Sequence, residues 1–472
     1  MATLKKKYAE AKKVGGGYHA QVLLPRSELI AAGKATRTAV PRESHAEWSP
    51  SAKRRDPVDV LEESNRERLA ELVPIRYGRM LRSAFTFLRG SAGLMAYDLS
   101  NTPTSGIRVQ ACGDCHLLNF GLFATPERNL IFDINDFDET LPAPWEWDVK
   151  RLAASFAVAA RDDNLSDKDA EACAIECVRA YRERMRMYSK MSPLEVWYHR
   201  LDVQTLIDMA PGAEAKKRRE AFAEKARSRV GEYLAPKIVE SVEGHRRLVD
   251  QPPVLFHMTE TNQVKVIHDA LEAYRLSLPD ERRCLFDNYR LADIAVKVVG
   301  IGSVGTRCLV GLFFSADDHP LLLQFKEACP SVLEPYAGKS LYDNHGQRVV
   351  IGQRLMQSSS DIFLGWTHGQ RGFHYFGRQL RDMKFSLPLV GLSAEMLKRY
   401  AEVCGWTLAH AHAKSSWAAA SLISGYLGKS TVFDEAIGKF ALAYAAQTLL
   451  DHTLLVAAVN HGRVEALIEE DL

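Results

Sequence analysis

The spacing of apolar residues divides the chain into helical blocks around a β-rich middle. Apolar side chains recur every three or four residues between Arg54 and Ser100, which predicts helix there. The same period predicts helices at 145–161, 168–191, 214–250, 264–278, 392–414 and 433–464. Short apolar runs between turn residues predict strands at 107–110, 119–122, 130–134, 296–299, 308–313, 321–325, 361–366 and 373–380, whereas 349–357 fits either element. Blocks of helix and blocks of strand indicate an α+β fold.

One stretch, from Val109 to Thr140, holds a compact group of polar residues, and we call it the catalytic stretch after its predicted role. It contains the pattern G-D-x-H-x-x-N and then a strand-like run that ends in three aspartates: Asp114, His116, Asn119, Asp133, Asp136 and Asp138. Phosphoryl transfer needs an aspartate beside the attacking hydroxyl, and an asparagine and a second aspartate that hold the metal ions. The five-residue step from Asp114 to Asn119 is that of the kinase catalytic loop. A simpler alternative is that these residues only form turns.

The turn at 125–129 lies between the two short predicted strands of this stretch. A hairpin there would return Asp136 toward Asp114. This matters because metal coordination requires closeness in space, not in sequence.

A glycine-rich motif follows much later in the chain. Its pattern is G-x-G-x-x-G, and its candidate phosphate-binding residues are Gly300, Gly302, Ser303 and Gly305. A dinucleotide-binding turn opens a helix, but here a β-rich run, a polar turn and a second run ending in Lys326 follow. A kinase has the same order of elements: a strand, a glycine loop, two further strands and a lysine. Glu327 or Glu334 is then the expected ion-pair partner of Lys326. Alternatively, Lys326 merely ends a strand at the surface.

Length and charge refine this organisation. The 472 residues exceed what one core usually organises, so we expect two lobes. The net charge of 61 − 59 = +2 selects no partner. Residues 1–55 contain twelve Lys/Arg and four Glu, and we expect a solvated, partly disordered arm there rather than a nucleic-acid or lipid surface. The expected regions are this arm at 1–55, a catalytic-loop half at 56–290, a β-rich nucleotide lobe at 291–385 and C-terminal helices at 386–472.

Localisation and cysteine chemistry follow from what the sequence contains. We see neither a signal peptide nor an apolar run of membrane-spanning length, so we expect a cytoplasmic protein that does not bind membranes. The eight cysteines are then free thiols. Cys112 and Cys115 match the haem attachment pattern C-x-x-C-H, which we reject because haem attachment belongs to exported chains. His410 and His412 are two positions apart and cannot share a helix face as zinc ligands.

Several longer segments of the sequence resemble a known family. The chain resembles the uncharacterised bacterial family known as domain of unknown function 2252, over roughly Arg54 to Ser415, in FLRGSAGLMAYDL, GDCHLLNFG, FDINDFDETLPAPWEWDVKRLAAS, VVGIGSVGTRCLVGL, LLLQFKEA, SDIFLGW and RQLRDMK. The family name implies no activity.

A more distant resemblance joins residues 113–119 to the catalytic loop of aminoglycoside and choline kinases. It implies Asp114 as catalytic base, Asn119 and Asp136 as magnesium ligands and Asp138 as an auxiliary carboxylate. Cys112 replaces the histidine usual in those kinases. The motif order is also reversed, which a circular permutation reconciles, with the helix at 392–414 standing where the helix before the catalytic loop belongs.

Together these features predict a two-lobed, circularly permuted, protein-kinase-like α+β fold with large helical additions. The predicted activity is ATP- and Mg-dependent phosphotransfer to a small hydroxylated substrate. AMP transfer, a nucleotide-binding pseudoenzyme and, less favoured, a nucleic-acid-associated protein remain as alternatives, and the oligomeric state is unknown. The permutation predicts that the Lys326 ammonium lies within roughly 10 Å of the Asp136 carboxylate, in a cleft between the sheet and the helical half.

Overall fold

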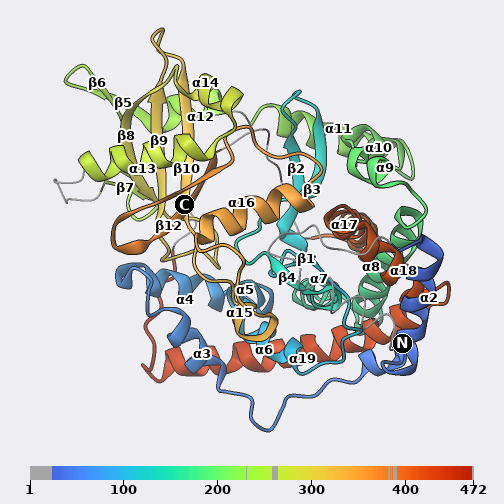
Figure 1. The fold of residues 1–472 in the computed structure, drawn as a ribbon. Coiled ribbons are helices and arrows are strands. Elements are labelled where there is room, and N and C mark those ends of the chain that lie inside the picture. Colours follow the sequence, from blue (N-terminus) through green and yellow to red (C-terminus); the bar gives the residue numbers. More distant parts are fainter. Residues whose placement is uncertain are drawn as a thin grey trace.

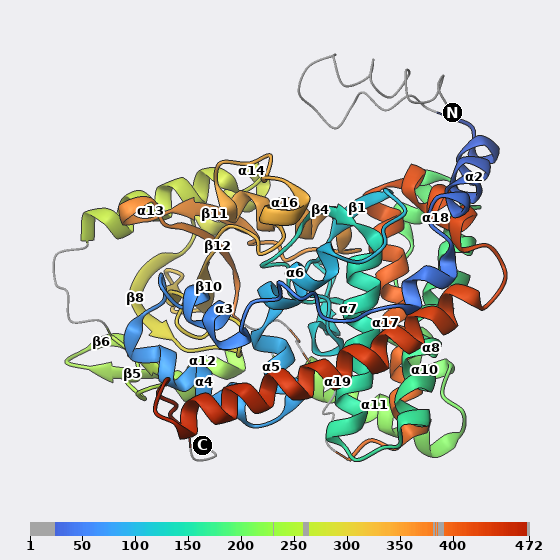
Figure 2. The same cartoon turned by 90° about the horizontal axis from the view of Figure 1, so that it is seen from below.

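A β-rich lobe lies beside a larger helical half (Figure 1). The computed structural model describes residues 24–229, 231–257, 264–380, 383, 385 and 391–469. Seen from below, the long helix α19 (Val432–Asn460) runs along the length of the helical half (Figure 2). The mixed α and β composition agrees with the predicted class.

The β-rich lobe contains a six-stranded antiparallel sheet in the order β11-β12-β10-β9-β8-β7. Its strands are β7 (Leu255–Phe256), β8 (Arg290–Lys297), β9 (Cys308–Phe314), β10 (Pro320–Glu327), β11 (Gly365–His368) and β12 (His374–Gln379). Strand β10 alternates its apolar residues between two cores: Leu323 and Phe325 pack with Tyr274, whereas Leu322 packs with Val310. Strand β8 pairs antiparallel with β9, and β9 pairs antiparallel with β10.

Helices cover both faces of this sheet. One core includes α13 (Val264–Ser277) and α14 (Asp280–Phe286), and the other includes α12 (Gly231–Ile238) and the hairpin of β5 (Val239–Val242) and β6 (His245–Leu248). Helix α16 (His345–Met356) packs on β11 and β12 and joins the lobe to the helical half.

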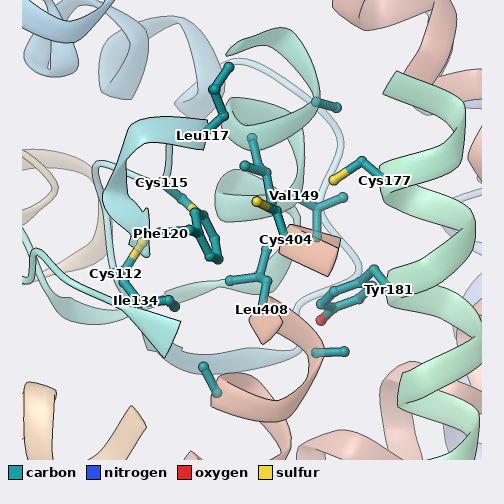
Figure 3. Packing of buried hydrophobic residues seen from close by; sticks show 14 of the residues in the cluster. Cys112, Cys115, Leu117, Phe120, Ile134, Val149, Cys177, Tyr181, Cys404 and Leu408 are labelled. Carbon is teal, nitrogen blue, oxygen red and sulfur yellow. The ribbon is translucent and has the colours of Figure 1, made fainter. Parts of the chain in front are cut away.

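The helical half is built on α7 (Trp145–Asp162), α8 (Asp167–Tyr188), α17 (Ala394–Ser415) and α19. Helices α8 and α17 pack closely because Gly405 has no side chain: a Cβ there would lie 2.0 Å from the Cys177 carbonyl oxygen. Cys177 and Cys404 fill this contact as buried free thiols, beside Leu117 and Phe120 of the catalytic stretch (Figure 3). This core therefore fixes the position of that stretch.

Shorter elements complete the described part of the chain. The small sheets pair β1 (Arg108–Ala111) with β4 (Leu141–Pro144) and β2 (Phe120–Ala124) with β3 (Leu130–Ile134). The remaining α-helices are α2 (Arg26–Ala35), α3 (Pro57–Ser64), α4 (Val73–Leu81), α5 (Ala84–Gly90), α6 (Ala92–Ser100), α9 (Pro193–Tyr198), α10 (Val203–Asp208), α11 (Ala213–Arg227), α15 (Glu334–Ala337) and α18 (Trp417–Leu427). The 3₁₀ turns are η1 (Thr36–Thr38), η2 (Arg42–Ala46), η3 (Ala70–Leu72), η4 (Leu117–Asn119) and η5 (Gln370–Gly372).

Two predicted element boundaries are wrong. The single helix expected at 214–250 is α11, α12 and then the β5–β6 hairpin, because Glu243 (φ +50°) and Gly244 (φ +82°) adopt the left-handed turn conformation that closes hairpins. The helical stretch from Arg54 to Ser100 is broken into four short helices, one of which begins at the Ser83 capping box. From the sequence we also expect a hinge between the lobes at residues 381–384. Of these residues, only Met383 lies within the described part of the chain.

The expectation of a solvated N-terminal arm is wrong for its described part, residues 24–55. Arg37 donates to the Tyr426 carbonyl at 2.7 Å and Arg42 to the Leu427 carbonyl at 2.7 Å, at the C-terminal end of α18. A cation is stabilised there by the helix dipole. Arg54 is buried against Asp98 and Asp451. Arg37, Arg42 and Arg54 thus bind the protein's own helices, whereas Lys34, Lys53 and Arg55 are exposed.

Helix α19 departs from another expectation, because by length and composition alone it is apolar enough to cross a membrane. In the structure it packs along α7 and α8. Its buried Asp434 pairs with Arg182 at 2.8 Å, and its buried Asp451 pairs with Arg54 at 2.6 Å. The sequence alone suggests that Arg182 belongs to a solvated basic helix face, but in the structure it forms an internal ion pair.

Candidate active site

The catalytic stretch and the glycine loop meet at a cavity of about 170 Å³ between the sheet and the helical half. The predicted residues that line it are Asp114, His116, Asn119, Asp136, Asp138, Gly300, Gly302 and Ser303. The β2–β3 hairpin returns the chain as predicted, so that both ends of the catalytic stretch reach the cavity. A larger cavity of about 320 Å³ lies behind this hairpin, but it is mostly apolar and none of the predicted site residues lines it.

Asp114 is held by a buried arginine. Arg151 of α7 donates from Nε to Asp114 Oδ1 at 2.7 Å, and the Asn119 side chain donates to the Asp114 carbonyl at 2.6 Å. The Asp114 side chain is 23% exposed, and Arg151 is only 1% exposed. Asp114 is therefore oriented from within the protein while its carboxylate remains accessible from the cavity.

The loop before Asp114 is fixed by a second residue of α7. Asp148 accepts hydrogen bonds from the Cys112 and Gly113 backbone at 2.7 and 3.0 Å, and His412 lies 3.1 Å from the same carboxylate. Gly113 has φ +83°, and a Cβ there would lie 2.4 Å from the Glu139 carbonyl oxygen, so only glycine fits. His412 thus has a structural role in supporting this loop. Position 112 itself, where the kinases that the motif resembles usually have histidine, is a cysteine.

Cys112, Cys115 and Asp148 form a buried cluster whose potential ligand atoms lie within 4.8 Å of one another. Asp148 already accepts two backbone hydrogen bonds, and burial raises the pKa of Cys115 to about 12. Asp148 therefore supports the backbone of the catalytic loop, and Cys112 and Cys115 pack in the apolar core beneath it (Figure 3).

His116 is unsuited to the role of a base. It is 3% exposed, and burial lowers its pKa to about 3, so the imidazole is neutral near pH 7. Its Nε2 lies 3.9 Å from Asp114 Oδ2, and its Nδ1 has no hydrogen-bond partner among the described residues. His116 can position a group in the cavity but cannot readily take up a proton.

Lys326 contacts both aspartates at the end of the catalytic stretch. Its Nζ lies 3.7 Å from Asp136 Oδ2 and donates to Asp138 Oδ2, which also accepts from the Ser303 hydroxyl at 3.4 Å. Burial alone would lower the pKa of Lys326, but the two carboxylates raise it above its ordinary value. The predicted limit of roughly 10 Å between Lys326 and Asp136 is met, and Lys326 is buried rather than at the surface.

The oxygen atoms here suit a hard divalent cation. Burial, and then the Asp136 carboxylate, raise the pKa of Asp138, because two neighbouring carboxylates resist ionising together. Asp138 Oδ1 is buried and has no hydrogen-bond partner among the described residues. Carboxylate and amide oxygens from Asp136, Asp138 and Asn119 are the ligand types that Mg²⁺ prefers.

The glycine loop connects β8 to β9, and a strand rather than a helix follows Gly305, as predicted. Gly300 lines the cavity with φ +69°, whereas Gly305 does not line it and lies against Arg68 with φ +87°. The loop is anchored to the helical half: Ile301 packs with Leu61 and Met80, and the Gly300 carbonyl accepts from Arg79 at 2.6 Å. We did not predict this anchoring, although an isoleucine inside a glycine loop was a signal for it.

The predicted ion-pair partners of Lys326 are wrong. Glu327 points to the opposite face of β10, as neighbouring strand residues do, and lies 3.3 Å from Arg307. Glu334 is carried away in α15, does not line the cavity, and lies 3.8 Å from His345. The carboxylates that neutralise Lys326 are those of Asp136 and Asp138.

Sequence reasoning missed several residues that build the site. Asp148 and Arg151 are three positions apart in α7, so both lie on one side of this helix, whose buried charged residues also include Glu146 and Lys150. Three further arginines line the cavity, namely Arg68, Arg76 and Arg89. They lie in a region that we interpreted only as helical.

Comparison with known proteins gives one match. A family model described as "Uncharacterized protein conserved in bacteria (DUF2252)" matches residues 68–458. Neither a curated protein nor a solved structure matches the chain.

Proposed function

Since the chain belongs to the DUF2252 family of uncharacterized proteins conserved in bacteria, whose description states no activity, we propose its function from the cavity alone. The proposal is an ATP- and Mg²⁺-dependent phosphotransferase that acts on a small hydroxylated molecule. One observation carries it: Lys326 contacts Asp136 and Asp138, and these two aspartates line one cavity with Asp114 and the glycine loop, although the residues come from distant parts of the sequence. This is the set of groups that phosphoryl transfer requires.

Asp114 is the proposed catalytic base. Arg151 occupies its Oδ1, and Oδ2 is the oxygen left to accept the proton of the acceptor hydroxyl. As that proton moves to Asp114, the hydroxyl oxygen forms a bond to the terminal phosphorus of ATP, the bond from phosphorus to the bridging oxygen breaks, and ADP leaves. Lys326 and the glycine loop would hold the phosphates in line for this attack.

Asn119, Asp136 and Asp138 are the proposed magnesium ligands. Bound Mg²⁺ would neutralise charge on the phosphates. The orphaned Asp138 Oδ1 and the crowding of two carboxylates support a cation at this position. Lys326 compensates both carboxylates; bound Mg²⁺ would take over this role, and we expect the Lys326 ammonium then to turn toward the phosphates.

We also propose that the architecture is a circularly permuted kinase-like fold. The antiparallel sheet with its glycine loop and lysine supports this assignment. Helix α17 supports the permutation, because Tyr400 Oη donates to the Leu117 carbonyl at 2.8 Å. A helix late in the sequence thus supports the catalytic loop, as the permutation requires. AMP transfer and nucleotide binding without turnover are the alternatives.

The test is binding and turnover of Mg·ATP by the full-length protein and by Asp114→Asn. The variant should bind Mg·ATP within about threefold of wild type, because Asp114 touches the acceptor rather than the metal, and turnover should fall by about 10² to 10⁴. A structure with bound Mg·ATP would show which phosphate faces Asp114. Absence of Mg·ATP binding in the wild type would refute the proposal.

A further inference from the structure

The cavity has a second wall, which is basic. We call Arg68, Arg76 and Arg89 the arginine wall; they line the same cavity as the aspartates of the catalytic stretch. They come from the segment before η3, from α4 and from α5. The proposed phosphotransferase activity assigns no role to this arginine wall.

Within the described residues, none of the three arginines forms an ion pair. Arg76 is 2% exposed and donates to neutral groups, including the Gly90 carbonyl at 2.7 Å and Ser64 Oγ at 3.2 Å. Arg68 donates to the Ser64 carbonyl at 3.2 Å and to the Val304 carbonyl. Arg89 has no hydrogen bond to the part of the chain that the structure describes, and its Nε is buried and unpartnered.

Three other buried arginines of this protein form ion pairs, whereas the buried Arg348 binds only backbone carbonyls among the described residues. Arg54 binds Asp98 and Asp451, Arg151 binds Asp114, and Arg182 binds Asp434. Carboxylates act on two of the three guanidinium groups only at longer range: Asp114 and Asp136 on Arg89, and Glu139, Glu327 and Asp138 on Arg68. Because removing an arginine from water without a directly bound counter-charge is costly, three such residues around one cavity indicate that an anion belongs there. Burial lowers the pKa of each of the three.

Helix α6 begins at the same wall. Ser91, Ala92, Gly93 and Leu94 line the cavity, and no side chain caps the first turn of α6. Free backbone N–H groups at a helix N-terminus attract an anion. His116, 3% exposed with an unpartnered Nδ1, also lines this cavity. Glu139 and Glu327 also line the cavity and would repel an anion. A bound anion therefore has to lie next to the arginines.

We propose that the arginine wall and the first turn of α6 bind a phosphate group, separate from the metal site at Asp136 and Asp138. The inference rests on the proposed function. Phosphate fits because it accepts several hydrogen bonds at once, which suits three guanidinium groups and backbone N–H groups. The phosphate belongs either to the end of ATP or to a phosphorylated acceptor, and the experiment distinguishes these two sources.

The test uses Arg89→Gln in the full-length protein, because Arg89 makes no hydrogen bond to the described residues and its loss should leave the fold intact. Arg66→Gln is the matched control: it lies nearby, with 76% of its side chain exposed. Calorimetry measures the affinity for ATP, ADP and AMP with Mg²⁺, and for inorganic phosphate with and without saturating Mg·ADP. Arg89→Lys keeps the charge and should lose less than Arg89→Gln.

If the site holds the end of ATP, Arg89→Gln should weaken ATP binding about ten- to hundredfold and leave AMP binding unchanged. If it holds an acceptor phosphate, nucleotide affinities should stay the same, and inorganic phosphate should bind the Mg·ADP-loaded variant about ten- to hundredfold more weakly than wild type. Equal affinities of Arg89→Gln and Arg66→Gln for all of these ligands would overturn the inference. If wild type binds phosphate in an Arg89-dependent way but no Mg·ATP, the proposed function fails and the phosphate site stands.

Discussion

The Lys326 ammonium lies 3.7 Å from the Asp136 carboxylate, although one residue is in the sheet and the other follows the β2–β3 hairpin. The sheet presents Lys326 from β10, and the hairpin presents Asp136 from the helical half. The contact therefore joins the two parts of the molecule, and the residues on either side of it give separate predictions.

Asp136→Asn should lower Mg²⁺-dependent ATP turnover by at least about hundredfold, because it removes a charged metal ligand. The fold should remain cooperative, since the change also relieves the crowding of Asp136 with Asp138. Turnover assays and urea unfolding measure the two effects. Asp317→Asn, in the exposed turn between β9 and β10, is the control. Full turnover in the Asp136 variant would mean that another carboxylate holds the metal.

Lys326→Met keeps the aliphatic stem and removes the charge. A lost charge-assisted contact of roughly 1.5–3 kcal/mol should weaken ATP binding about ten- to hundredfold. Calorimetry with Mg·ATP measures this, and Lys339→Met, at an exposed position, is the control. Wild-type affinity in Lys326→Met would show that the lysine only compensates the two aspartates.

His45 should make the protein less stable as pH falls. Burial lowers its folded pKa to about 3, below the ordinary value of 6.5, so between these values the unfolded chain binds a proton that the folded chain excludes. The contribution of His45 to the unfolding free energy should therefore decrease by about 1.4 kcal/mol per pH unit below pH 6.5.

Urea titrations at pH 7, 6 and 5 test this slope. His45→Gln should show a shallower pH dependence than wild type, whereas His268→Gln should match wild type because its side chain is 82% exposed. Parallel slopes for all three proteins would contradict the prediction.

Arg54→Met should destabilise the protein by about 3–5 kcal/mol, because it leaves Asp98 and Asp451 buried without their cation. The neighbouring Arg55→Met should cost less than about 1 kcal/mol, since Arg55 and Glu63 are 54% and 47% exposed. Chemical unfolding compares the two variants directly. Similar losses in both would show that burial does not decide the strength of these pairs.

Much of the site could be predicted because its residues occur in short motifs. Asp114, Asn119 and Asp136 belong to one continuous stretch, and the short apolar run before Lys326 identified its strand. The partner of Lys326 could not be predicted in this way, because it depends on how two distant segments pack. Glu334 was the natural candidate in sequence, but α15 carries it to His345 instead.

The same limit applies to the fold. Helix periods identified α7, α8, α17 and α19 to within a few residues, but local pattern alone did not reveal the β5–β6 hairpin. Nor could it show that Arg37 and Arg42 bind the end of α18, because a lysine- and arginine-rich segment has the same composition whether it is solvated or docked. Pairings across several hundred residues are properties of the packed structure.

The support of the catalytic loop by α17 also bears on how the chain is synthesised. Tyr400 and His412 of α17 bind the Leu117 carbonyl and Asp148, across separations of 283 and 264 residues. On the ribosome, Asp114 therefore emerges long before the helix that holds its loop in place. A nascent chain that lacks α17 has the motif but not the geometry, and it must keep the apolar faces of α7 and α8 from aggregating until translation reaches residue 415. Assembly of the site is thus a late event of translation, and chaperone demand should fall on the intermediate that has α7 and α8 but not yet α17.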